Sequence, residues 1–272
     1  MTTAVGGWPG PQAWWPSDWN HRQSKNLIFW GRFKTIEPPA NEPESAEYDC
    51  KGIKRANPAA IDGVYWIDPD GEGGEAPMKV RCDMSRGGWT LIYSNYAAQS
   101  AEGTWALSWD QTINSGLNTE RPGDGLNYLM PLKHWTKLAN AQLKSSASGT
   151  INLNNFSLNA NDNYKLVFDP TGNDRMDYHR LRPLSTVDRD NDVWDNHCAN
   201  YAKTFGWYGA CCNMCMTTAI GGWPGPDAWV PSDWNHRQAT YLEFWAQFKE
   251  PTTIRNTRET AQRSCMEIKV ND

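Results

Sequence analysis

The stretch Asp188-Arg189-Asp190-Asn191-Asp192, followed by Cys198 and Cys211, makes the sharpest structural prediction in this chain. Alternating carboxylates place several oxygens on the inside of a tight turn, where a hard cation such as Ca²⁺ takes side-chain and backbone oxygens as ligands. Without a cation these charges repel. The short segment between the two cysteines has the length of a disulfide loop that would hold the turn in shape. The sequence therefore predicts a calcium site here, with a solvated acidic turn as the alternative.

The loop differs from the EF-hand, which opens in the same way. An EF-hand requires Gly at the sixth position and Glu at the twelfth. Val193 and Ala199 occupy these positions here. The loop is therefore calcium-like without being an EF-hand.

Other stretches resemble the fibrinogen-like domain family, whose lectin-type members include ficolins and tachylectins, and they occur in the family's order. The resemblance covers about residues 47 to 272, and it is weak between about 93 and 180. It rests on DGVYWIDPDG (62–71), VRCDM (80–84) and GGWTLI (87–92) at the start, on STVDRDND (185–192) and the segment 198–211 further on, and on MEIKV (266–270) as a closing strand.

The resemblance implies an α+β fold of mostly short antiparallel strands, with a loop-rich, calcium-binding C-terminal subdomain and a helix near Leu132 to Leu143. It implies that Ca²⁺ is held by the Asp190 and Asp192 side chains and by the backbone carbonyls of Trp194 and Asn196, with Asp188 assisting electrostatically. It also implies disulfides between Cys50 and Cys82 and between Cys198 and Cys211. The pairing of Cys212, Cys215 and Cys265 stays open.

Composition excludes several classes of protein. The net charge of -5 comes with no basic stripe, which disfavours nucleic acid as a partner, and no apolar run approaches the roughly 18 residues that span a bilayer. Seven cysteines favour disulfides and an extracellular, secreted protein, although no signal peptide is visible in this chain. Zinc binding by residues 211–215 is disfavoured, because the second pair of ligands is missing.

Residues 1–34 recur at 216–249, with 25 of 34 positions identical. The first copy is interpreted as the remnant of an upstream repeat. Residues 35–46 then form a Pro- and Glu-rich linker, and residues 47–272 form the fibrinogen-like domain. The competing interpretation is a genuine accessory segment whose Trp residues pack on the domain.

Catalytic motifs are missing, so we expect no enzyme. The sequence has no Gly-x-Ser-x-Gly elbow, no His-Glu-x-x-His and no phosphate-binding glycine loop. A pair of glycosidase carboxylates would leave no local signature, and it remains the alternative.

Two functions compete. The first is a calcium-stabilised extracellular lectin for glycans or glycoproteins, with acetylated or sialylated sugars as candidate ligands, acting in innate recognition or adhesion. The second is a non-catalytic protein–protein interaction or structural module of a matrix or signalling protein. A homo-oligomer or tandem-repeat partner fits either one. The resemblance aligns Tyr208, Ala210 and Cys211 with the lectin pocket, and the Trp-rich segment adds Trp223, Trp234 and His236 as candidate ligand-binding residues.

The chain holds one Asn-x-Ser/Thr sequon, Asn155-Phe156-Ser157. We expect it on the surface if the chain is secreted.

Overall fold

The computed structural model describes residues 41–71, 73–101, 103–123, 125–209, 233–235 and 237–250. All of them lie in the unit formed by residues 39–272. The sequence repeat at residues 1–34 and the closing strand predicted at residues 266–270 lie outside the described residues. Those two predictions therefore stay untested.

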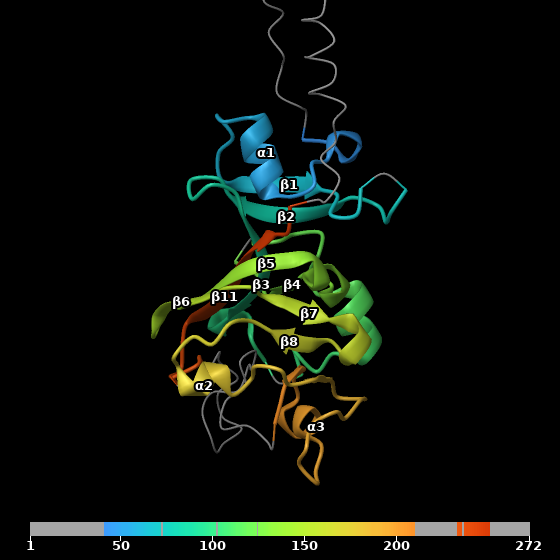
Figure 1. Cartoon of the computed structure of the whole chain (residues 1–272), viewed down its shortest axis with the longest axis vertical. Helices are drawn as coiled ribbons and strands as arrows, with labels where there is room; N and C mark the ends of the chain where they lie inside the picture. Colours follow the sequence, from blue (N-terminus) through green and yellow to red (C-terminus); the bar gives the residue numbers. More distant parts are fainter. Residues whose placement is uncertain are drawn as a thin grey trace, which may run out of the picture. The chain divides into compact units, whose positions relative to one another are not determined.

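A seven-stranded antiparallel sheet forms the centre of the described chain (Figure 1). The strand order is β1-β2-β3-β11-β5-β6, and β4 pairs with β3. The strands are β1 Gly63–Ile67, β2 Met78–Asp83, β3 Trp89–Tyr96, β4 Tyr128–Leu129, β5 Leu138–Ser145, β6 Gly149–Leu153 and β11 Tyr241–Phe248.

Smaller elements surround this sheet. Two short antiparallel pairs are formed by β7 Ser157–Asn159 with β8 Lys165–Val167 and by β9 Leu184–Ser185 with β10 Gly206–Trp207. The helices are α1 Cys50–Ala56, α2 Asp174–Asp177 and α3 Cys198–Ala202, with 3-10 turns η1 Pro43–Ser45, η2 Ala97–Gln99, η4 Leu132–Lys137 and η5 Ala160–Asp162 and a π-helical turn η3 Gln111–Ser115. The predicted α+β fold of mostly antiparallel strands is confirmed.

Strand β11 comes from the second copy of the repeat and lies in the middle of the sheet. It pairs antiparallel with β3 on one side and with β5 on the other. Its sequence YLEFWAQF alternates, and its inward side chains Leu242, Phe244, Ala246 and Phe248 are buried. This period of two is the pattern of a half-buried strand.

The helix predicted near Leu132 to Leu143 is wrong beyond Lys137. The helical part is the 3-10 turn η4, which ends at Lys137, and the strand β5 begins at Leu138. Burial along β5 favours every second residue toward its end, where Ala141, Leu143 and Ser145 face inward. As a strand, this segment pairs with both β11 and β6, so its backbone N–H and C=O groups are hydrogen-bonded on both sides. This tertiary pairing outweighs the helix-like spacing of its apolar residues.

The core beneath the sheet is aromatic. The ring centroid of Trp135 lies 5.9 Å from that of Phe156, 6.0 Å from that of Trp207 and 5.8 Å from that of Phe244. All four side chains are buried. Tilted aromatic pairs at these separations add to the stability that area burial supplies, and here they join η4, β10 and β11 in one cluster.

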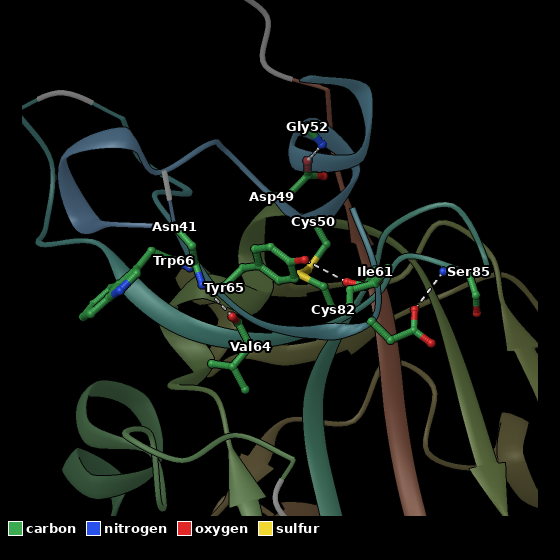
Figure 2. The surroundings of a disulfide bond; sticks show 11 residues. Asn41, Asp49, Cys50, Gly52, Ile61, Val64, Tyr65, Trp66, Cys82 and Ser85 are labelled. Carbon is green, nitrogen blue, oxygen red and sulfur yellow. Dashed lines mark hydrogen bonds between the residues drawn. A yellow bond between two sulfur atoms is a disulfide. The ribbon is translucent and has the colours of Figure 1, made fainter. Parts of the chain in front are cut away.

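The predicted disulfide between Cys50 and Cys82 is present and ties α1 to β2 (Figure 2). Helix α1 begins at an N-cap, Asp49, whose side chain accepts a hydrogen bond from the Gly52 N–H at 2.7 Å. Gly88 lets this helix approach the sheet, because a Cβ there would lie 2.6 Å from the Cys50 carbonyl oxygen and its φ is +86°.

Asn41 closes the outer edge of the sheet. Its side-chain amide donates to the Val64 carbonyl at 2.9 Å and accepts from the Trp66 N–H at 3.1 Å, as a neighbouring strand residue would (Figure 2). Glu47 continues this cover through a bridge to Ile67. Asn41 is therefore bound to β1, and of the linker predicted at residues 35–46 only residues 41–46 are described, so its bounds stay a prediction.

Candidate metal and recognition site

The acidic loop leaves β9 through a tight turn that Asp188 secures. Backbone hydrogen bonds join Thr186 and Arg189 in both directions. The Asp188 carboxylate accepts from the Thr186 hydroxyl at 2.7 Å and from the Trp109 N–H at 2.8 Å. Burial raises the pKa of Asp188, but these hydrogen bonds outweigh it and hold the pKa below its ordinary value. Asp188 thus fixes the loop to residue 109.

The two residues between the carboxylates face the body of the domain. The Arg189 guanidinium lies 3.9 Å from the Trp109 ring centroid and donates to the Asn163 side-chain oxygen at 2.9 Å. Asn191 turns back toward β9, donating its side-chain amide to the Leu184 carbonyl at 2.7 Å. Asp190 and Asp192, which alternate with these two residues, make contacts of their own.

Asp190 and Asp192 lie against one another. The Asp192 N–H donates to the Asp190 carboxylate at 3.1 Å. The Asp192 carboxylate itself accepts from the backbone N–H groups of Trp194, at 2.9 Å, and Cys198, at 3.0 Å. Burial raises the pKa of Asp192, the two N–H groups lower it, and Asp190 raises it again, so that the pKa lies above its ordinary value. The loop therefore holds two carboxylates whose charges oppose each other.

These residues fit a calcium ion. The carboxylates offer lone pairs beyond those that the backbone N–H groups use, and a dication between them would offset their repulsion. Among the residues that the structure describes, no group of three or more His, Cys, Asp or Glu side chains could hold a metal. A calcium ion would therefore need carbonyl or water oxygens as well, as predicted for Trp194 and Asn196. Calcium binding itself stays a prediction.

Behind the loop, a small buried cluster supports α3. Its members are Cys198, Ala199, Ala202 and Tyr208, with the partly buried Trp194 packed against them. Cys198 is disulfide-bonded. Because Cys50 and Cys82 bond to each other, the partner of Cys198 lies outside the described residues, and its predicted pairing with Cys211 stays a prediction.

Two of the predicted ligand-binding residues are described, and both are buried. Tyr208 is 1% exposed, and its hydroxyl donates to the Thr204 carbonyl at 3.0 Å. Trp234 is 4% exposed and belongs to the main core cluster, whereas Tyr208 belongs to the small cluster behind the loop. Neither offers a ring face to a sugar. Ala210, Cys211, Trp223 and His236 lie outside the described residues.

Exposed apolar side chains occur on the acidic loop and near it in sequence instead, and the sequence patterns do not predict them. Of the five large hydrophobic residues exposed in the described chain, Tyr178, Leu181, Val193 and Tyr201 lie within residues 178–201, and Ile61 is the fifth. Within residues 178–201 the most exposed of these side chains is Val193, which is 71% exposed and occupies the position where an EF-hand has Gly. Exposure depends on tertiary packing, so no local signal could have found this group.

Contacts link three of these residues, Tyr178, Val193 and Tyr201, to the acidic loop. The Val193 N–H donates to the Gly209 carbonyl at 3.2 Å, and a Cβ built on Gly209 would lie 2.3 Å from the Tyr178 hydroxyl. The Trp194 ring, next along the loop, meets the Tyr201 ring edge to face at 5.7 Å. We call Tyr178, Val193, Trp194 and Tyr201 the loop surface.

Comparison with known proteins places this fold. Residues 137–224 match the profile of the fibrinogen beta and gamma chains, C-terminal globular domain, and residues 30–141 match that of the fibrillar collagen C-terminal domain. The fibrinogen-like globe domain of human ANGPTL6 has a TM-score of 0.59 at 21% identity and covers 75% of this chain and 96% of its own. A lamprey fibrin D-dimer solved with a Gly-His-Arg-Pro-amide peptide ligand also has a TM-score of 0.59, at 16% identity and 78% coverage of each chain.

Sequence relatives agree with the structural ones. Human angiopoietin-related protein 7 is 30% identical over 70% of this chain and 57% of its own length. Fibrinogen-like protein A of Apostichopus parvimensis is 30% identical over 64% of this chain and 65% of its own length. The chain thus spans between 57% and 65% of these curated relatives.

The fold is that of a fibrinogen-like globe. The chain is similar to the fibrinogen-like domain family, in agreement with the resemblance of its sequence motifs. The families matched are non-enzymatic, in line with the prediction that the chain is not an enzyme. Within the described residues, no helix combines the length and apolar character that crossing a membrane requires.

Proposed function

We propose that this chain is a non-catalytic, extracellular recognition module that binds a protein partner through the loop surface. One observation carries the proposal: three of the five large hydrophobic side chains exposed in the described chain, Tyr178, Val193 and Tyr201, are linked by contacts to the acidic loop. Grouped exposed apolar residues with polar surroundings are typical of protein interaction sites. Here the surroundings are the carboxylates of the loop.

The loop surface has the composition of an interface anchor. It combines two Tyr and one Trp, which are enriched where binding energy concentrates, with a branched aliphatic residue at the loop tip. The rings of Trp194 and Tyr201 hold each other in place, so little side-chain entropy is lost on binding.

Calcium would set the shape of this surface. Val193 and Trp194 directly follow the two candidate carboxylate ligands, and the Asp192 carboxylate already binds the Trp194 N–H. A cation held by Asp190 and Asp192 would stabilise the same loop from the other side. Partner binding should therefore depend on calcium.

The relatives support protein binding more than sugar binding. Angiopoietin-related proteins recur among them, and a fold neighbour is solved with a bound tetrapeptide. The glycan lectin is the second candidate, favoured by the paired Asp190 and Asp192. It is weakened by the burial of Tyr208 and Trp234, which removes two of its predicted ring contacts.

Cell-surface binding tests the proposal. A tetramerised chain, used because linked copies raise avidity, is applied to animal cells with calcium or with chelator. We expect calcium-dependent binding that trypsin treatment of the cells abolishes and periodate oxidation of their sugars leaves intact. Val193→Asp with Tyr201→Asp should weaken it about tenfold or more, equal to about 1.4 kcal/mol.

The control is Ile61→Asp. Ile61 is 75% exposed but lies before β1, so its substitution replaces an exposed apolar side chain by a carboxylate away from the loop surface and should leave binding unchanged. Binding that periodate removes and trypsin spares, together with calcium-dependent signals on a glycan array, would establish the lectin in its place.

A further inference from the structure

The turn between β6 and β7 presents the sequon asparagine outward. Asn154 and Asn155 form the turn and are exposed, whereas Phe156 is fully buried. Phe156 packs on the rings of Trp135 and Phe244 and donates its N–H to the Ala139 carbonyl at 2.7 Å. The sequon is thus anchored through its middle residue, which fixes Asn155 on the outside.

The backbone of Asn155 favours asparagine at this position. Its φ is 51°, in the left-handed region that asparagine tolerates better than most residues. Its side-chain amide donates to the Asp169 carboxylate at 2.8 Å, and Asp169 is itself exposed. The amide nitrogen therefore sits at the surface, beside an acceptor that needs only one of its two hydrogens.

We propose that Asn155 carries an N-linked glycan in the secreted protein. The inference rests on the extracellular location in the proposed function. Ser157, the first residue of β7, supplies the hydroxyl of the sequon. The glycan would extend from the β6–β7 turn.

The transfer needs a co-substrate of known class, a lipid-diphosphate-linked oligosaccharide, and its transferase. The anomeric carbon of the first sugar forms a bond to Asn155 Nδ2, and its bond to the diphosphate oxygen breaks. The lipid diphosphate leaves with the electron pair, and Nδ2 gives one proton to the transferase. The remaining N–H keeps its hydrogen bond to Asp169, so the modification removes no contact that the fold shows at this atom.

Secretion from animal cells behind a fused signal peptide tests the site. Peptide N-glycosidase should lower the mass of the full chain by one glycan and convert Asn155 to Asp in the peptide mass spectrum. Ser157→Ala and Asn155→Gln should each abolish the shift, and Ser157→Thr should retain it. Asn154→Gln is the matched control, since it changes the neighbouring exposed residue of the same turn and should leave the shift intact.

The proposal is overturned if the secreted parent shows no mass loss, or if the loss persists in either Ser157→Ala or Asn155→Gln. If one of these variants is not secreted, the other decides, with Ser157→Thr showing that the position tolerates substitution. The readout is a mass and not an affinity. A glycosylated chain that binds no cells would refute the proposed function and leave this inference standing.

Discussion

The guanidinium of Arg189 lies over the indole of Trp109, with 3.9 Å between its central carbon and the ring centroid. The same Trp109 gives its backbone N–H to Asp188. Asp188 and Arg189, two adjacent residues of the acidic loop, therefore both bind Trp109, which lies just before η3. Neither is a predicted metal ligand, so the position of the loop is set independently of any cation.

Arg189→Ala should destabilise the fold by about 0.5–2 kcal/mol, the range for cation–π pairs from exposed to desolvated sites. It should also weaken calcium binding, because the loop loses one of its two anchors. Urea unfolding and calcium titration measure the two effects. Arg182→Ala is the control, because it removes a cation–π contact 5.2 Å from the Tyr178 ring centroid and spares the loop. Equal calcium affinities in the parent and Arg189→Ala would contradict the anchoring role.

Asp190→Asn should have opposite effects with and without calcium. In chelator it removes the charge that opposes Asp192, and it should stabilise the chain by a few tenths to about 1 kcal/mol, since partial exposure screens the pair. In calcium it should lose the parent's gain, about 2.7 kcal/mol at a hundred times the dissociation constant. Thermal melting in both conditions measures this. Asp195→Asn, at an exposed carboxylate of the same loop, should behave like the parent.

The pH dependence in chelator follows from the same pair. Burial and Asp190 raise the folded-state pKa of Asp192 above its unfolded value. As the pH falls through that raised pKa, the folded state takes up a proton before the unfolded state does, and the free energy of unfolding rises. Below the ordinary aspartate value the gain is complete, while Asp188, whose pKa is lowered, begins to lose its contribution. Urea unfolding across this range should show the rise in the parent.

In Asp190→Asn the rise should shrink. Burial also raises the pKa of Asp49, which is present in both proteins. The difference in pH dependence between the parent and the variant therefore reports on Asp192 alone. Parallel curves for the two proteins would show that the carboxylates do not interact.

Two buried tyrosines should respond oppositely to loss of the hydroxyl. Tyr128 is fully buried, and its hydroxyl has no hydrogen-bond partner in the described chain, so Tyr128→Phe should be neutral or stabilising by up to about 1 kcal/mol. Tyr208 is equally buried, but its hydroxyl donates to the Thr204 carbonyl, so Tyr208→Phe should cost about 1 kcal/mol. Chemical denaturation of both variants measures the contrast. A stability loss in Tyr128→Phe as large as in Tyr208→Phe would reveal a hidden partner.

Short-range sequence patterns determined much of this protein. The spacing of Asp188, Asp190 and Asp192 alone indicated a loop with paired carboxylates, because residues two apart in an extended turn share a side. The motifs at residues 62–71 and 80–92 indicated the family, the antiparallel sheet and the disulfide between Cys50 and Cys82. Each of these depends on residues close together in the chain or on a recognisable motif.

The tertiary structure decided the rest. β11 pairs with β3 although the two strands lie about 150 positions apart in the sequence. Because β11 also pairs with β5, residues 138–145 form a strand where local spacing suggests a helix. The same packing buries Tyr208 and Trp234 and leaves Val193 and Tyr201 exposed. An aromatic side chain lowers its free energy equally by filling a core or by covering a ligand. Only the elements that pack around it determine which, and those come from distant parts of the sequence.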